Sequence, residues 1–68
     1  MRITKHAQAR IQERAIPTEE LVHCITHGVR LVNRNDPSKT TIVDNKINLY
    51  IVTDKAETTV ITVFRKEK

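Results

Sequence analysis

Residues 5–17 read KHAQARIQERAIP, and they combine a helical spacing of apolar residues with positive charge. Successive residues of a helix turn by about 100°, so positions four apart share one face. Ala7, Ile11 and Ala15 follow that spacing and form a narrow apolar stripe. The stripe predicts a helix over residues 5–15 with one face on a hydrophobic core.

A second row of side chains lies one position earlier on this helix. His6, Arg10 and Arg14 repeat the four-residue step, so a histidine and two arginines share one flank. Two guanidinium groups beside an imidazole suit an anion site that contains an acid/base group. The simpler interpretation is a solvated basic face whose arginine stems lie along the core.

Residues on either side mark the boundaries of this helix. Thr4 is a candidate N-cap, since a threonine hydroxyl accepts a hydrogen bond from the first turn. Pro17 disfavours helical geometry at Ile16 and so ends the first helix. A second helix is predicted over residues 18–27, with Pro17 as an alternative first residue and Gly28 as a left-handed stop.

The second helix also has an apolar face. We expect this face to consist of Leu21, Val22 and Ile25, with Cys24 at its margin. Two short helices separated by a tight break predict an αα-hairpin over residues 1–28.

From residue 29 onward the apolar spacing becomes strand-like and β-branched residues become frequent. Strands are predicted over residues 29–33, 40–43, 47–53 and 58–65, and residues 2–4 form either a short first strand or a lead-in. Helices that precede strands favour an α+β fold. We expect the helical hairpin to pack on one face of an antiparallel meander over residues 29–65.

The 68 residues are predicted to form a single domain, residues 1–68. Its core must be small, because a chain of this length buries only about 60% of its unfolded surface. Cys24 is the single cysteine, which excludes an intrachain disulfide and favours a reducing compartment. The opening MRITKHAQ contains no apolar run, and no stretch is long enough to cross a membrane. We expect a cytoplasmic protein without membrane contact.

Positive charge is concentrated at the two ends of a chain whose net charge is +4. The basic residues of these clusters are Arg2, Lys5, Arg10 and Arg14 near the start, and Arg65, Lys66 and Lys68 at the end. If the last strand lies beside the first helix, both clusters form one basic surface that suits a polyanion. Tyr50 and Phe64 are the only tyrosine and phenylalanine, so contacts to nucleic acid are expected mainly at phosphate.

Several short motifs together resemble a known family. They are TKHA at residues 4–7, Arg10, QER-x-I at residues 12–16, TEE at residues 18–20 and VITVFR at residues 60–65. This pattern resembles the domain of unknown function 4258 family, a group of small bacterial and phage-associated domains. The resemblance spans nearly the whole chain.

The resemblance implies a fold similar to the RelE-like ribonuclease toxins, which cut RNA without a metal and are neutralised by an antitoxin. His6 and Arg10 match the family positions on the first helix, and Thr62 with Phe64 match those on the final strand. Two positions depart from the family pattern. Glycine is usual where this chain has Ala15, and tyrosine is frequent where Phe64 stands.

Metal-independent RNA cleavage gives each candidate residue a role. His6 is the expected general acid/base, since an imidazole can donate or accept a proton near neutral pH. Arg10 and Arg14 are expected to stabilise charge on the phosphate, and Thr62 to orient a phosphate oxygen. The expected substrate-binding residues are Lys5, Tyr50 and Arg65. The simpler alternatives are structural roles. His6 would cap or support the start of the helix, Arg14 would form an ion pair with an acid such as Glu19, and Tyr50 and Phe64 would serve in packing.

A metal site is the next alternative, because His23 and His27 lie four residues apart with Cys24 between them. The sequence signals no second cysteine and no acidic partner, and the flank faces away from the predicted apolar face. We therefore expect neither a metal nor another cofactor.

A non-catalytic binding module is the rival function from a different class. A short basic domain with many strands can dock by edge pairing onto a protein partner or onto a second copy of itself. Such a module would inhibit or regulate a larger enzyme. DNA binding ranks last, since no helix-turn-helix signature is present.

Overall fold

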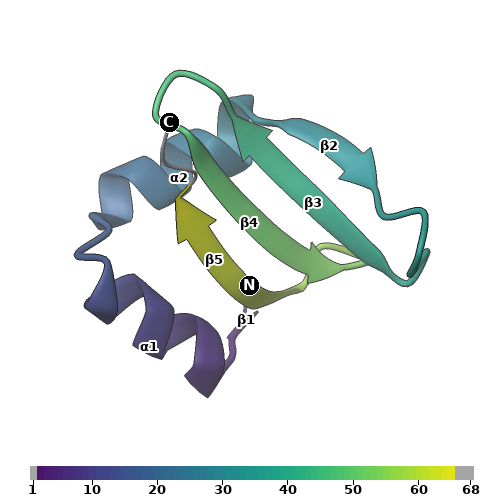
Figure 1. Ribbon diagram of the computed structural model, residues 1–68, viewed down its shortest axis with the longest axis horizontal. Helices are drawn as coiled ribbons and strands as arrows, with labels where there is room; N and C mark the ends of the chain where they lie inside the picture. The colour runs from purple at the N-terminus through teal and green to yellow at the C-terminus, as the bar shows by residue number, and fades with distance from the viewer. Residues whose placement is uncertain (1, 66–68) are drawn as a thin grey trace.

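The computed structural model describes residues 2–65, which form a five-stranded sheet with two helices packed against it (Figure 1). The elements along the chain are β1 (Arg2–Ile3), α1 (Lys5–Glu13), α2 (Thr18–His27), β2 (Val29–Val32), β3 (Lys39–Asp44), β4 (Leu49–Asp54) and β5 (Thr59–Arg65). The strand order in the sheet is β1-β5-β4-β3-β2. This arrangement confirms the predicted α+β class.

The prediction of a purely antiparallel sheet is wrong at β1. Strands β2 to β5 form the expected meander, but β1 pairs parallel to β5, with Arg2 opposite Thr59 and Ile3 opposite Val60. The backbone amide of Thr4 continues this pairing by donating to the Val60 carbonyl at 3.1 Å. In the sequence, two helices and three strands lie between β1 and β5. This long connection allows the chain to return in the same direction beside β1, and the sheet is therefore mixed.

Helix α1 begins as predicted and ends earlier than predicted. The Thr4 hydroxyl accepts a hydrogen bond from the Ala7 amide at 3.1 Å, which confirms the N-cap. Ala15 does not continue the helix but adopts a left-handed conformation with φ of 49°. The Ile16 amide then donates to the Ile11 carbonyl at 3.0 Å, which completes a Schellman motif. Buried Ile16 therefore takes the place in the apolar stripe that was predicted for exposed Ala15.

Helix α2 has the predicted bounds but a different stop. Gly28 has φ of −69°, so it is not left-handed. Glycine is required there for space. A Cβ atom would lie 2.4 Å from the Cys24 carbonyl oxygen and 2.6 Å from the Ile42 side chain. The glycine thus allows the end of α2 to lie close to β3.

The apolar face of α2 is turned relative to the prediction. Cys24 is fully buried rather than marginal, and its thiol contacts the carbonyl oxygens of Ile42 and Leu49 at 3.6 Å each. Val22 is 56% exposed and lies outside the core. This rotation moves His23 from the expected solvent position toward the sheet, where it is partly buried.

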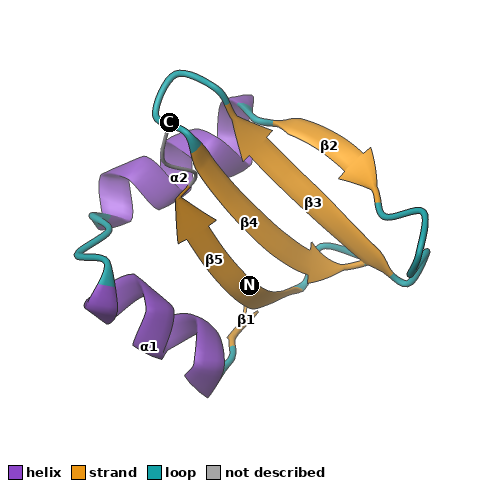
Figure 2. Ribbon diagram, viewed as in Figure 1, coloured by secondary structure: helices purple, strands orange, loops and turns teal. Residues whose placement is uncertain are grey.

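The core lies between the helices and one face of the sheet (Figure 2). Its largest fully buried side chains alternate along the central strands, at Ile42, Leu49, Ile51 and Val63. The opposite parity carries less buried side chains at Tyr50, Val52, Thr62 and Phe64. We call this second set the open face of the sheet. Neither helix within residues 2–65 has the length and apolar character needed to span a membrane.

Candidate functional site

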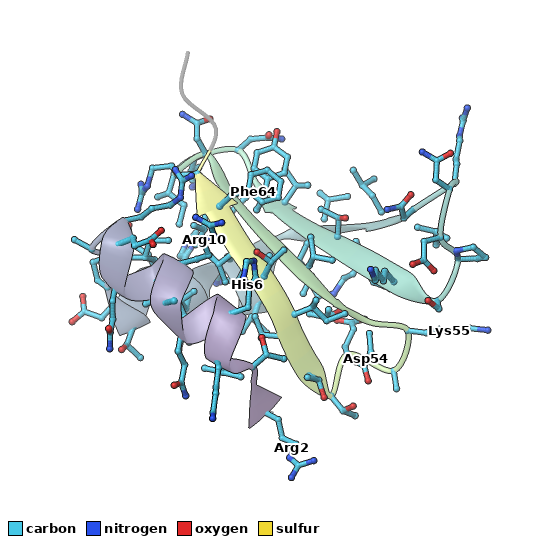
Figure 3. All side chains as sticks on the ribbon, turned by 60° about the horizontal axis from the view of Figure 1, so that its bottom comes forward. Arg2, His6, Arg10, Asp54, Lys55 and Phe64 are labelled. Carbon is cyan, nitrogen blue, oxygen red and sulfur yellow. The ribbon has the colours of Figure 1, made fainter. Side chains whose placement is uncertain are left out.

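The basic flank of α1 lies beside β5, because α1 packs on that strand directly after β1 has paired with it. Figure 3 shows His6 and Arg10 extending from α1 toward β5. His6 is exposed, and so is Lys5 beside it. Arg10 donates to a Glu13 carboxylate oxygen at 2.9 Å, but both side chains are well exposed, at 42% and 60%. Such a pair contributes little to stability, so Arg10 remains available to a ligand.

Arg14 caps the end of α1 and is exposed. Its predicted alternative was an ion pair with an acid such as Glu19. Across residues 2–65 no ion pair involves Arg14. The charged row of His6, Arg10 and Arg14 therefore lies along one exposed to half-exposed flank.

The open face of the sheet brings together the predicted strand residues. Thr62 lies directly opposite Val52 in the register, and Tyr50 lies opposite Phe64. Tyr50 and Thr62 therefore share one face, as their spacing predicts. The rings of Tyr50 and Phe64 stack with centroids 5.0 Å apart and an interplanar angle of 16°. Phe64 thus packs on a neighbouring ring, in line with the simpler interpretation.

Arg65 does not join the other predicted residues. It lies opposite Leu49 in the register, so its side chain projects from the face of the sheet that the helices cover. Its guanidinium donates to the Glu20 carboxylate at 2.5 Å and to the Ile47 carbonyl at 3.1 Å. The prediction that Arg65 joins the basic surface of α1 is therefore wrong. Its side chain instead links β5 to α2 through Glu20. Lys66 and Lys68 lie outside the described residues.

A pair of titratable side chains that the sequence did not predict joins α2 to β3. Asp44 is only 5% exposed, and its carboxylate accepts a hydrogen bond from Nδ1 of His23 at 2.5 Å. Desolvation acts to raise the pKa of Asp44. Hydrogen bonds from His23 and the Lys46 backbone amide outweigh that effect, and the pKa is lowered. Asp44 is therefore a carboxylate at neutral pH, and it accepts a hydrogen bond from the Nδ1–H group of His23.

The His23–Asp44 pair lines a pocket of about 410 Å³ between the end of α2 and the β3–β4 turn. The other lining residues are His27, Val29, Val43, Asn45 and Lys46. Cys24 points into the core instead, where burial and the nearby Asp44 raise the pKa of its thiol to about 11. It is not available as a ligand, and within residues 2–65 no group of three or more His, Cys, Asp or Glu side chains is placed to hold a metal ion.

Comparison with known proteins gives one result. Neither a curated protein nor a solved structure matches the chain. A family described as a domain of unknown function, DUF4258, matches residues 3–65, which span both helices, strands β2 to β5 and the second residue of β1. The chain therefore belongs to the DUF4258 family.

Proposed function

We propose that this protein is a metal-independent ribonuclease that cleaves RNA phosphodiesters with His6 as general acid/base. One observation carries the proposal. His6 and Arg10 extend from α1 toward β5, the strand whose open face carries Thr62. An imidazole, a guanidinium and a hydroxyl on neighbouring elements are the groups that phosphate-directed acid/base catalysis needs.

The proposed reaction is an attack of a ribose 2′-oxygen on the adjacent phosphorus. A general base takes the 2′-hydroxyl proton as the new P–O bond forms, and the P–O5′ bond breaks. A general acid gives a proton to the leaving 5′-oxygen, so the products are a 2′,3′-cyclic phosphate and a 5′-hydroxyl. His6 is exposed and can reach such a substrate without opening the core.

The remaining candidates act on charge and position. Arg10 and Arg14 follow His6 along one flank and stabilise the negative charge that gathers on the phosphate. Thr62 orients a phosphate oxygen through its hydroxyl. Tyr50 is a second proton carrier or a surface on which a base stacks, and exposed Lys5 attracts the backbone electrostatically.

Two further considerations support this proposal. Exposed or half-exposed basic residues line α1, which suits a polyanion, and RNA is abundant in the cytoplasm, where we place the protein. The resemblance to the DUF4258 family implies a RelE-like fold with metal-free chemistry, and it makes a neutralising antitoxin a partner to be expected. Arg65 has no part in this proposal, because its guanidinium binds Glu20 and Ile47.

The experiment is incubation of purified protein with total RNA in EDTA, beside the variants His6→Ala and His27→Ala. Both histidines are exposed helix residues, so neither substitution should unfold the protein. We expect cleavage by the wild type and by His27→Ala, and none by His6→Ala. Intact RNA with the folded wild type, or equal cleavage by both variants, would remove His6 from the mechanism.

The binding module is a second candidate, and the edge strand β2 favours it. All four residues of β2 are exposed, Val32 is 70% exposed, and β2 is an edge strand of the sheet that residues 2–65 form. Unpaired strand edges with apolar side chains invite pairing with another chain. Light scattering with size-exclusion chromatography tests this function. A dimer that Leu31→Lys dissociates, together with inactivity on RNA, would favour the module over the ribonuclease.

A further inference from the structure

The pocket at the end of α2 contains side chains that the proposed ribonuclease does not use. His23 and His27 line it from successive turns of one helix, and Asp44 lines it from the end of β3. Residues four apart on a helix are neighbours on its surface, so the two imidazoles face the same space. Their ring centroids are 4.8 Å apart and their planes are tilted by 47°.

This separation matches two histidines that share one metal ion. A nitrogen ligand of zinc lies about 2.0–2.1 Å from the ion, which places two adjacent ring centres about 4.5–5.2 Å apart. The observed 4.8 Å falls inside that interval.

Asp44 fixes the form of His23 that a metal requires. Its carboxylate accepts a hydrogen bond from Nδ1–H, so the unprotonated nitrogen of neutral His23 is Nε2, on the far side of the ring. A carboxylate behind a metal-binding histidine holds the ring in place and raises its basicity. Asp44 is thus the acidic partner that the sequence alone does not signal. Cys24 is buried in the core and does not face the two histidines.

We propose that His23 and His27 bind a divalent transition metal ion, with zinc as the reference ion, and that Asp44 is the positioning residue behind His23. No third protein ligand is assembled within residues 2–65, so water completes the coordination. With two protein ligands, the proposed site differs from structural zinc sites, in which four protein ligands close the coordination sphere. The site is independent of the proposed ribonuclease, which uses His6 on α1.

Zinc titration of the tag-free, EDTA-treated and dialysed protein tests the site. Calorimetry should show one zinc ion bound per chain, and NMR should show shifts of the ring signals of His23 and His27 but not of His6. His27→Gln should lower the affinity at least tenfold, and this exposed position keeps the fold intact. Asp44→Asn should lower it by about 10- to 100-fold and should redistribute the ring proton of His23 between Nδ1 and Nε2.

His6→Gln is the matched control, because it removes a histidine of α1 and leaves α2 unchanged. It should bind zinc as the wild type does. The absence of saturable zinc binding by the folded wild type would overturn the proposal. Affinity that is unchanged in His27→Gln, or reduced equally in His6→Gln, would overturn it as well.

Discussion

At the scale of single residues, two positions in the helical half constrain the backbone most strongly. Ala15 holds a left-handed conformation that reverses the chain after α1, and Gly28 lets the end of α2 approach β3. The sequence predicts a helix that still includes Ala15 and assigns the left-handed geometry to Gly28, whereas the structure has the left-handed residue at Ala15. The resemblance implies a glycine at this position in the family, and glycine adopts a left-handed conformation without steric cost.

Ala15→Gly should stabilise the protein by about 0.5–1 kcal/mol. A left-handed conformation costs a residue with a Cβ atom about 1–2 kcal/mol, and part of that gain is lost to the larger entropy of unfolded glycine. Urea unfolding measures the change. Ala9→Gly, at an exposed position within α1, is the control and should destabilise by about 0.5–1 kcal/mol. Equal losses in both variants would contradict the role given to Ala15.

Gly28→Ala should destabilise the protein by about 1–3 kcal/mol, because its methyl group has no room beside Cys24 and Ile42. The cause is overpacking and not backbone strain, since φ at this position is −69°. Thermal or urea unfolding gives the free energy difference. A variant as stable as the wild type would show that the contact of α2 with β3 yields easily.

At the scale of elements, side chains that accept backbone hydrogen bonds define the turns. Asp54 ends β4, and its carboxylate accepts hydrogen bonds from the Thr58 amide at 2.7 Å and the Thr59 amide at 3.1 Å. The Thr58 hydroxyl also donates to it, at 2.6 Å. The predicted strands over residues 47–53 and 58–65 leave a turn between them, and these contacts explain why it closes the β4–β5 hairpin.

The β4–β5 turn should make stability depend on pH in the acid range. Hydrogen bonds from Thr58, followed by that from the Thr59 amide, lower the pKa of Asp54 below its usual 3.8. Since the folded pKa lies below the unfolded one, the stabilisation is complete above pH 3.8 and is lost as the pH falls through the folded pKa. Urea unfolding at a series of pH values should show this loss.

Two variants test that assignment. Asp54→Asn should show a shallower loss of stability on acidification than the wild type. Thr58→Val deletes one donor and should move the pKa of Asp54 back toward 3.8, as read from its carboxyl carbon by NMR. An identical pH profile for Asp54→Asn and the wild type would place the acid sensitivity elsewhere.

At the scale of the whole molecule, the sequence predicts the elements better than it predicts their contacts. Helix and strand bounds follow from local spacing, and the fold class follows from their order. The contact of His23 with Asp44 spans 21 residues and that of Arg65 with Glu20 spans 45. No local pattern signals either contact, because each depends on where α2 lies on the sheet. The parallel pairing of β1 was unpredictable for the same reason.

The same distinction applies to the candidate sites. The row of His6, Arg10 and Arg14 could be predicted because it belongs to one helix. Its position beside β5 depends on the parallel β1–β5 pairing, which also brings the flank next to the strand that carries Thr62. Part of the pocket could be predicted, because the four-residue spacing of His23 and His27 places both on one side of a helix. Its acidic member, Asp44, comes from another element and became evident only in the fold.

The most direct test of the ribonuclease is cleavage of a DNA oligonucleotide that contains a single ribonucleotide, in EDTA, by wild type and His6→Ala. The account predicts one cut, on the 3′ side of the ribose, that leaves a 2′,3′-cyclic phosphate and requires His6. An all-deoxy oligonucleotide should stay intact, because it lacks the attacking 2′-hydroxyl. Cleavage of the all-deoxy strand, cleavage that persists in His6→Ala, or an intact ribonucleotide with folded wild type would contradict it.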